Sequence, residues 1–215
     1  IKRYDEAWML MNQALDIAIQ IDNKKQIVAC HKQLYYLCRE FKRMMNERGD
    51  EQASTLFFRE SLLHEMYFSE KPRLAELTVR YEALRCDIMQ QYYMNKDYDN
   101  VIRIATSLDI HDDADPNASC LVYYYKAQAY VKLENYPMAK EAFFREFELR
   151  KKYLGWEEED TILACQNLGV LHSFCNEREE ALACFREAYG HEVKKNGEDS
   201  EMAQKLLQYI SVVES

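Results

Sequence analysis

The sequence predicts an all-α protein, a right-handed superhelical solenoid of about ten helices arranged as antiparallel pairs. Glycine and proline are scarce, with 5 and 3 residues in a chain of 215, and folds rich in strands and turns use those residues often. Apolar residues recur at helical spacing along most of the chain. The last third also matches itself at an offset of 42 residues, as expected for a stack of similar helix pairs.

Five helices are expected in the first half of the chain, over residues 4–21, 24–46, 50–69, 72–94 and 97–108. The first begins with Tyr4 and carries Met11 and Ala14, the pattern expected of the second helix of a pair. The chain is therefore expected to begin mid-repeat, as a fragment of a longer protein. Pro72 suits the first turn of its helix, where the N–H that proline lacks would have no intrahelical partner.

Five more helices are expected over residues 117–133, 136–153, 158–175, 178–195 and 198–214. Gly169 is the small residue that would let a neighbouring helix approach closely. Gly197 stands where a left-handed C-terminal cap is expected, after Lys194 and Lys195 at the negative end of the helix dipole. The last helix is expected to cap the stack, with its inward side chains at Ala203, Leu206, Leu207 and Ile210.

The repeated positions resemble the tetratricopeptide repeat (TPR). The later unit matches through Leu168, Gly169, His172, Ala181, Phe185 and Ala188, and the earlier one through Ala127, Tyr130, Tyr136, Ala139 and Phe143. The 42-residue period resembles the longer-helix variety found in kinesin light chains and bacterial signalling proteins. The resemblance implies one solenoid over 1–215, with its clearest repeats at 117–157 and 158–197 and a capping helix at 198–214. It also implies that another polypeptide binds along the concave side.

Charge and cysteine usage limit the function classes. The net charge of −9 argues against nucleic acid as a partner, because phosphates require a basic face. No apolar run approaches the roughly 20 residues that span a bilayer, so no membrane contact is expected. The seven cysteines lack C-x-x-C spacing, and several fall on apolar helix faces. Reduced, buried thiols are therefore expected, and with them a cytoplasmic location.

Signatures of catalysis are missing from the sequence. It contains no G-x-G-x-x-G, P-loop or G-x-S-x-G motif, so we expect neither an enzyme nor a cofactor. His64 and Glu65 begin like a zinc-protease motif, but Phe68 stands where the second histidine is required. We interpret His64 as a surface or groove residue.

Two other candidate metal sites fail on spacing. The acidic run 109–117 lacks the glycine and the glutamate of a calcium-binding EF-hand loop, so it is expected to be a solvated turn that caps the next helix. Cys175, Cys184 and His172 have no fourth ligand at a suitable spacing, and we interpret them as packing residues.

A binding surface is the remaining prediction. The first helix of each pair would line the concave side, where residues four apart project together. In the clearest repeats these residues are Tyr124, Gln128 and Lys132, followed by Gln166, Val170 and Phe174. The weaker units add Cys86, Gln90 and Tyr93, and before them Tyr35, Arg39 and Arg43. The groove would run from a basic end to a middle of amides and aromatic rings.

The leading hypothesis is a protein- or peptide-binding scaffold, the interaction segment of a larger signalling or adaptor protein. One alternative is a sensor for a small signalling peptide, similar to bacterial quorum-sensing receptors, in which Gln128, Gln166 and Asn167 would hold the peptide backbone. Another is an oligomerisation module in which the same surface forms a homodimer. The size of a saturating ligand would separate the first two hypotheses, and the dependence of mass on concentration would identify the third.

Overall fold

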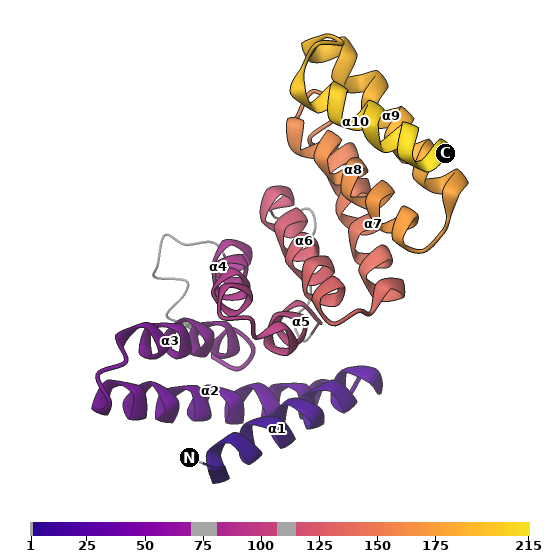
Figure 1. Cartoon of the computed structure of the whole chain (residues 1–215). Helices are drawn as coiled ribbons and strands as arrows, with labels where there is room; N and C mark the ends of the chain where they lie inside the picture. Colours follow the sequence, from indigo (N-terminus) through magenta and orange to yellow (C-terminus); the bar gives the residue numbers. More distant parts are fainter. Residues whose placement is uncertain (1, 70–80, 107–114) are drawn as a thin grey trace. The chain divides into compact units, whose positions relative to one another are not determined.

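The computed structural model describes residues 2–69, 81–106 and 115–215, and it divides into two compact units, Ile1–Ile110 and His111–Ser215. The described residues form ten α-helices and no strand, which confirms the all-α prediction (Figure 1). That a single solenoid spans residues 1–215 stays a prediction. Within the described ranges, no helix combines the length and the apolar character that crossing a membrane requires.

Unit 1 contains five helices, each packed on the next along the chain. They are α1 (Lys2–Gln20), α2 (Lys24–Glu47), α3 (Glu51–Glu65), α4 (Tyr81–Met94) and α5 (Tyr98–Thr106). The side chains of Asn23 and Asp50 accept hydrogen bonds from backbone N–H groups in the first turns of α2 and α3, which fixes where these helices begin. Stacked rings of Phe41 and Phe57, 4.9 Å apart, join the same two helices.

Unit 2 repeats this arrangement with α6 (Pro116–Lys132), α7 (Tyr136–Tyr153), α8 (Glu159–Phe174), α9 (Arg178–Asn196) and α10 (Glu201–Glu214). Asp115 caps α6 and is followed by Pro116 in the first turn, as the sequence predicted for this turn. Residues 109–114 of the acidic run lie outside the described residues. Pro72 and the expected helical residues 72–80 also lie outside them.

Small residues bring the helices of unit 2 close together, as predicted. Ala139 and Ala181 are fully buried. A Cβ atom built on Gly169 would come within 2.8 Å of Cε1 of Phe185, a distance that atoms in contact do not tolerate. The absence of a side chain at residue 169 therefore lets α9 pack this closely on α8. Gly197 ends α9 with a φ of 86°, in the left-handed region that favours glycine.

Two predictions about burial need correction. Ala203 and Leu206 of α10 are buried, but Leu207 is 38% exposed, because it lies about 100° round the helix from Leu206 and off the stripe that meets α9. All seven cysteines are free thiols, and five of them are buried, but Cys175 and Cys184 are half-buried.

Candidate protein-binding groove and a buried polar network

An apolar hollow of about 190 Å³ opens between α6, α7 and α8 of unit 2. Its lining residues are Gln128, Val131, Tyr136, Phe143, Asn167, Val170, Leu171 and Phe174. The lining is apolar except for the Tyr136 hydroxyl and the two amides, Gln128 and Asn167. An apolar hollow with a few polar groups is the usual character of a site that takes up a side chain or a small ligand.

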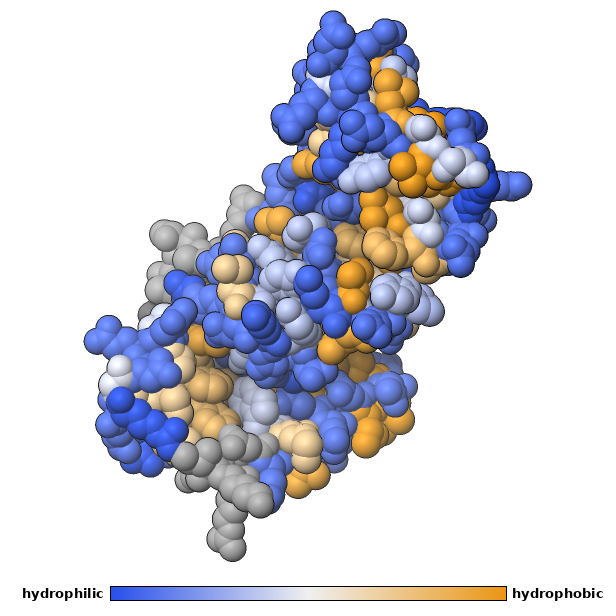
Figure 2. All heavy atoms as spheres, in the orientation of Figure 1, coloured by the Kyte–Doolittle hydropathy of each residue, from blue (hydrophilic) through white to orange (hydrophobic). Residues whose placement is uncertain are grey.

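A second hollow of about 230 Å³ lies between α8, α9 and α10, lined by Val170, Ser173, Phe174, Phe185, Tyr209, Val212 and Val213. Val170 and Phe174 line both hollows, so the two form one surface, which we call the α8 groove. The Phe174 ring stands between them and is 73% exposed. Figure 2 shows hydrophobic residues gathered over α8 and α10, where this groove lies.

Three of the predicted binding residues meet in the α8 groove: Gln128, Val170 and Phe174. Lys132 is exposed at the end of α6. Tyr124 is half-buried, and its ring meets the rings of Tyr125 and Phe143 at centroid distances of 5.4 and 6.5 Å. Their role in binding stays a prediction.

Gln166 does not project into the groove as the sequence predicted. Its side chain is buried, and its Oε1 atom has no hydrogen-bond partner. The reason is that α8 packs against α7 on one side and α9 on the other, so the face that carries residue 166 is covered. The peptide-sensor hypothesis therefore loses one of its three amides.

The remaining predicted residues lie in unit 1. Gln90 is exposed and Tyr93 is half-buried, with its ring 5.6 Å from that of Tyr98. Arg39 donates to the Tyr35 hydroxyl at 3.2 Å, and Arg43 forms surface ion pairs with Glu40 and Glu47 at 2.8 and 3.0 Å. That these residues share a groove with the residues of α6 and α8 stays a prediction.

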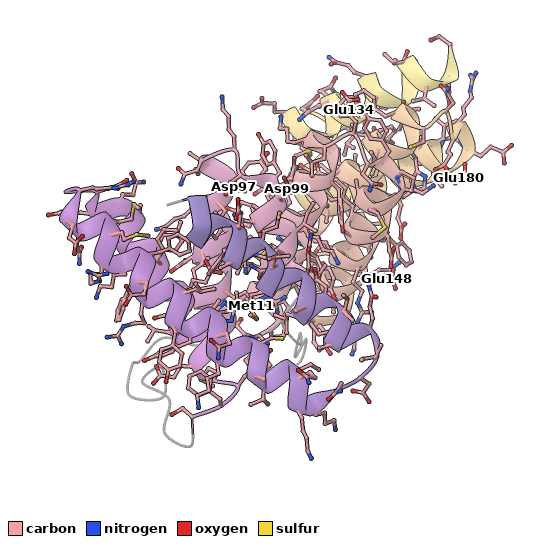
Figure 3. All side chains as sticks on the ribbon, turned by 90° about the horizontal axis from the view of Figure 1, so that it is seen from below. Met11, Asp97, Asp99, Glu134, Glu148 and Glu180 are labelled. Carbon is pink, nitrogen blue, oxygen red and sulfur yellow. The ribbon has the colours of Figure 1, made fainter. Side chains whose placement is uncertain are left out.

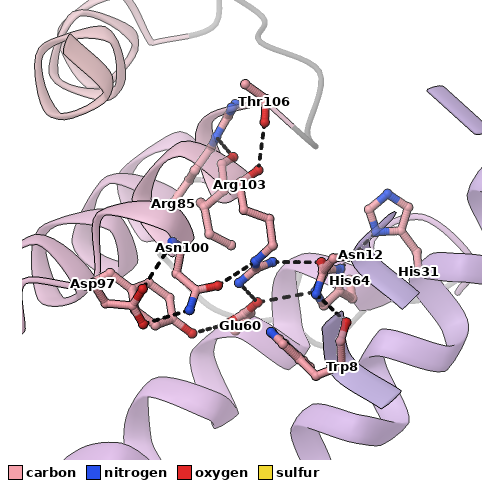
Figure 4. Close-up of polar contacts among 12 residues, drawn as sticks. Trp8, Asn12, His31, Glu60, His64, Arg85, Asp97, Asn100, Arg103 and Thr106 are labelled. Atoms are coloured by element: carbon pink, nitrogen blue, oxygen red, sulfur yellow. Dashed lines mark hydrogen bonds and ion pairs between the residues drawn. The ribbon is translucent and has the colours of Figure 1, made fainter. Parts of the chain in front are cut away.

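Sequence reasoning missed a polar network in the core of unit 1 (Figure 4). Glu60 of α3 is fully buried. Its Oε1 accepts from Nη2 of Arg103, and its Oε2 accepts from the hydroxyl of Tyr92, both at 2.5 Å. Glu60 lies on the same face of α3 as Leu56 and Leu63, four residues after one and three before the other. A carboxylate on such an apolar stripe is the signal that could have revealed the network.

Arg103 of α5 joins this carboxylate to α1. Its Nη1 donates to Oδ1 of Asn12 at 3.3 Å, and its Nε donates to Oδ1 of Asn100 at 2.8 Å. The guanidinium also lies 4.9 Å from the centre of the Trp8 ring. Asn12 is held in turn by a bond from its Nδ2 to the Trp8 carbonyl at 2.9 Å. One arginine therefore ties α1, α3 and α5 together.

His64 extends the network and corrects the sequence interpretation, because it is fully buried and not a surface or groove residue. Its Nε2 lies 3.6 Å from Oε1 of Glu60, and its Nδ1 lies 2.9 Å from Nδ1 of His31. A neutral imidazole carries one N–H. If the N–H of His64 faces the Glu60 carboxylate, His31 must donate from its Nδ1. The His31 ring stacks on Tyr67 at 3.7 Å.

The electrostatics of this network follow from burial and the Arg103 charge. Burial raises the pKa of the Glu60 carboxyl, but the Arg103 charge, the nearby His64 ring and the bond from Tyr92 outweigh it and lower the pKa to about 2. Burial, with the charges of His64 and Arg103, lowers the pKa of His31 to about 2. Glu60 is therefore ionised and His31 neutral at pH 7.

A cation could in principle meet this network through Cys38, Glu60 and His64, whose ligand atoms lie within 4.8 Å of one another. Both oxygens of Glu60 already accept hydrogen bonds, and the Arg103 guanidinium would repel a second positive charge. Burial also raises the pKa of the Cys38 thiol well above its usual value, which disfavours the thiolate that binds a metal. The group fits a buried ion pair better than a metal centre.

Charge is unevenly shared between the units. Unit 2 contains 20 of the 37 acidic residues and 12 of the 28 basic residues, so it carries a net charge of −8 and unit 1 carries −1. Unit 2 as a whole is therefore acidic, whereas unit 1 is close to neutral.

The fold and groove define a helical-repeat protein of the TPR-like class. No protein-family model matches the chain, and no curated protein matches it. Among solved structures, it is similar to the crystal structure of BtubC (BKLC) from P. vanneervenii, a kinesin light chain-like protein with a TPR-type helical fold. The TM-score is 0.57 and the identity 13%, over 98% of this chain and 82% of that chain. At this identity the likeness shows the fold alone, and the TPR-like fold is confirmed.

Proposed function

We propose that the chain is an interaction scaffold whose unit 2 binds a segment of another protein in the α8 groove. The exposed Phe174 ring, with an apolar hollow on each side, is the observation that carries this proposal. A large aromatic ring in water loses the free energy that its burial would contribute, about 1.5–3 kcal/mol. A partner that covers the ring and fills both hollows recovers that free energy.

The size and lining of the hollows indicate what the segment presents. Their volumes of about 190 and 230 Å³ suit one or two apolar side chains each. Gln128 and Asn167 line the first hollow, where their amides can both donate to and accept from a peptide backbone. The groove therefore suits a segment with two apolar anchors.

Charge adds a second requirement. Because unit 2 carries a net charge of −8, we expect the segment or its flanks to be basic. Long-range attraction of this kind mainly raises the association rate, and salt weakens it. The proposed partner is thus a basic segment with two apolar anchors, and a cytoplasmic role in signalling or as an adaptor stays a prediction.

Selection from a random peptide library tests this proposal. Peptides would first be selected for binding to the immobilised wild-type chain. Those that also bind the immobilised Phe174→Asp variant would then be discarded, because they do not depend on the groove. Phe144→Asp is the matched control, because Phe144 is also an exposed ring of unit 2, at 53%, and does not line the groove. We expect peptides retained by the wild type and by Phe144→Asp but lost from Phe174→Asp. Peptides retained equally by all three proteins would overturn the assignment of the groove.

A further inference from the structure

Helix α1 and the residue that follows it, Ile21, whose N–H bonds to the Ile17 carbonyl at 3.1 Å, expose a row of apolar side chains on unit 1. Leu10, Ile17 and Ile21 are 59%, 57% and 64% exposed, and Ala14 between them is exposed as well. The spacing of four, three and four residues places all four on one narrow stripe of a helix, as in the seam of a coiled coil. We call Leu10, Ala14, Ile17 and Ile21 the outer stripe.

The outer stripe is separate from the face that α1 uses inside its own unit. Trp8, Met11 and Leu15 pack with Cys30 and Leu34 of α2, and Figure 3 shows Met11 on the side of α1 that meets the rest of the unit. At 100° per residue, the two stripes lie roughly 120° apart round the helix. Packing within unit 1 therefore explains the inner stripe and leaves the outer one facing solvent.

A surface of this kind favours association. Isolated apolar residues are normal on a protein surface, but a contiguous apolar stripe marks a contact site. Val28, near the start of α2, is also exposed, at 40%. Figure 2 shows hydrophobic residues gathered at the edge of unit 1 where α1 ends and α2 begins.

We propose that the outer stripe is a self-association surface, on which two copies of the chain pair α1 against α1 in antiparallel orientation. A two-fold axis between Ala14 and Ile17 places Leu10 of one copy against Ile21 of the other. Ala14 then meets Ile17, so that the small residue leaves room for the large one. The stripe is thus complementary to itself, which a two-fold symmetric contact requires.

The charges beside the stripe support the antiparallel direction. Glu6 lies within about 50° of the stripe's centre, at its N-terminal end, and it is exposed. Lys24 and Lys25 are exposed immediately after the other end. Antiparallel pairing brings Glu6 of each copy beside the lysines of its partner, whereas parallel pairing would place like charges together. Glu6 also meets the positive N-terminal end of the partner's α2.

Mass measured by light scattering over a range of concentrations tests this proposal. We expect a monomer–dimer equilibrium for the wild type and a dissociation constant at least tenfold higher for Ile17→Glu. Phe144→Glu is the matched control, because Phe144 is a similarly exposed apolar residue, at 53%, that belongs to neither the outer stripe nor the α8 groove. It should leave the dissociation constant unchanged. Circular dichroism would check that each variant keeps its helix content.

Charge reversal tests the direction without touching the apolar stripe. Glu6→Lys and Lys25→Glu should each weaken the dimer, and the double variant should restore it, because the two charges meet across the contact. A monomer at every concentration would overturn the proposal, because the stripe would then not mediate self-association. A dimer that Ile17→Glu leaves intact would also overturn it, because the contact would lie elsewhere. The α8 groove is not involved, so neither result bears on the proposed function.

Discussion

Nη2 of Arg103 lies 2.5 Å from Oε1 of Glu60, inside the core of unit 1 and 43 residues apart in the chain. The carboxylate is fully buried, and the Arg103 guanidinium supplies the positive charge beside it. Burying an ion pair gains little over burying apolar residues of similar size, but removing one partner leaves an uncompensated charge. The pair therefore makes unit 1 sensitive to single substitutions.

We expect Arg103→Met to destabilise unit 1 by roughly 3–5 kcal/mol, because Glu60 would stay buried without its positive partner. The double variant Glu60→Leu/Arg103→Met should recover most of that loss. Denaturant unfolding, monitored by the fluorescence of Trp8 in a Trp156→Phe background, would measure these changes in the unfolding free energy. Trp8 is the tryptophan of unit 1.

Arg43→Met is the control for this prediction. Arg43 forms two ion pairs on the surface of α2, where exposed pairs contribute at most about 1 kcal/mol. Equal losses of stability from Arg43→Met and Arg103→Met would contradict the importance of the buried pair.

Acid should destabilise unit 1. The pKa of His31 falls from 6.5 to about 2 on folding, mainly through burial, and the pKa of His64 is lowered for the same reason. A lowered pKa means that the stability contributed by the neutral form is complete above pH 6.5 and is lost as the pH falls. The unfolding free energy, followed through Trp8, should decrease below pH 6.5 by up to about 1.4 kcal/mol per pH unit for each histidine.

The variant His31→Gln separates this histidine effect from other titrations. In this variant one fewer proton is taken up on unfolding. The unfolding free energy should therefore depend less steeply on pH between pH 6.5 and 4.5, which lies above the range in which Glu60 titrates. The slope is the quantity to compare, because the substitution changes the absolute stability as well. An unchanged slope would show that His31 is protonated in the folded chain.

Unit 2 should respond to pH in the opposite direction through Glu146. This carboxyl is buried, and its Oε2 has no hydrogen-bond partner, although Oε1 accepts from Arg150 at 2.8 Å. Burial raises its pKa from 4.5 to about 7, against the opposing charge of Arg150. A raised pKa means that its contribution is complete below pH 4.5 and is lost as the pH rises through 7.

The expected loss between pH 4.5 and 7 is on the order of 3 kcal/mol for Glu146 alone. Unfolding followed through Trp156 in a Trp8→Phe background would measure it, and Glu146→Gln should remove most of this dependence. If the variant keeps the wild-type pH profile, the carboxyl is already ionised in the fold at low pH.

Gly169→Ala should destabilise unit 2 by about 1–3 kcal/mol, the usual cost of inserting a methyl group into a filled contact. The new Cβ would meet Phe185 at 2.8 Å. Phe185→Leu in the same chain should recover part of the loss, because it shortens the side chain that is struck. Gly190→Ala is the control, since a Cβ at that helical position meets nothing within 4 Å, and alanine there should be neutral or stabilising.

Local pattern predicted the parts of the structure that depend on neighbours in sequence. The repeat places small side chains at Ala139, Ala181 and Gly169, and close helix packing requires them there. Residues four apart on one helix share a face, so Gln128 and Val170 were found before their groove was seen. Gln166 has the same spacing but is buried. Spacing shows which residues share a face of α8, but it does not show which face the neighbouring helices cover.

The polar network could not be predicted in the same way. Glu60 and Arg103 are 43 residues apart, and His31 and His64 are 33 apart, so no spacing rule joins either pair. A charged residue on an apolar stripe is visible in the sequence, but its partner is not. The packing of α3 against α4 and of α4 against α5 brings Arg103 to Glu60, and the packing of α2 against α3 brings His31 to His64. The sequence could indicate that Glu60 needs a partner and could not say which residue supplies it.

Photo-crosslinking from position 174 would show whether a bound peptide lies in the α8 groove. A benzophenone-bearing phenylalanine would replace Phe174, whose ring is 73% exposed, and a peptide selected on the wild-type chain would be added before illumination. We expect a crosslink between residue 174 and an apolar residue of the peptide. We expect no crosslink when the benzophenone-bearing residue replaces Phe144 instead. Crosslinks of equal yield from both positions, or from position 144 alone, would contradict the proposed binding in the α8 groove.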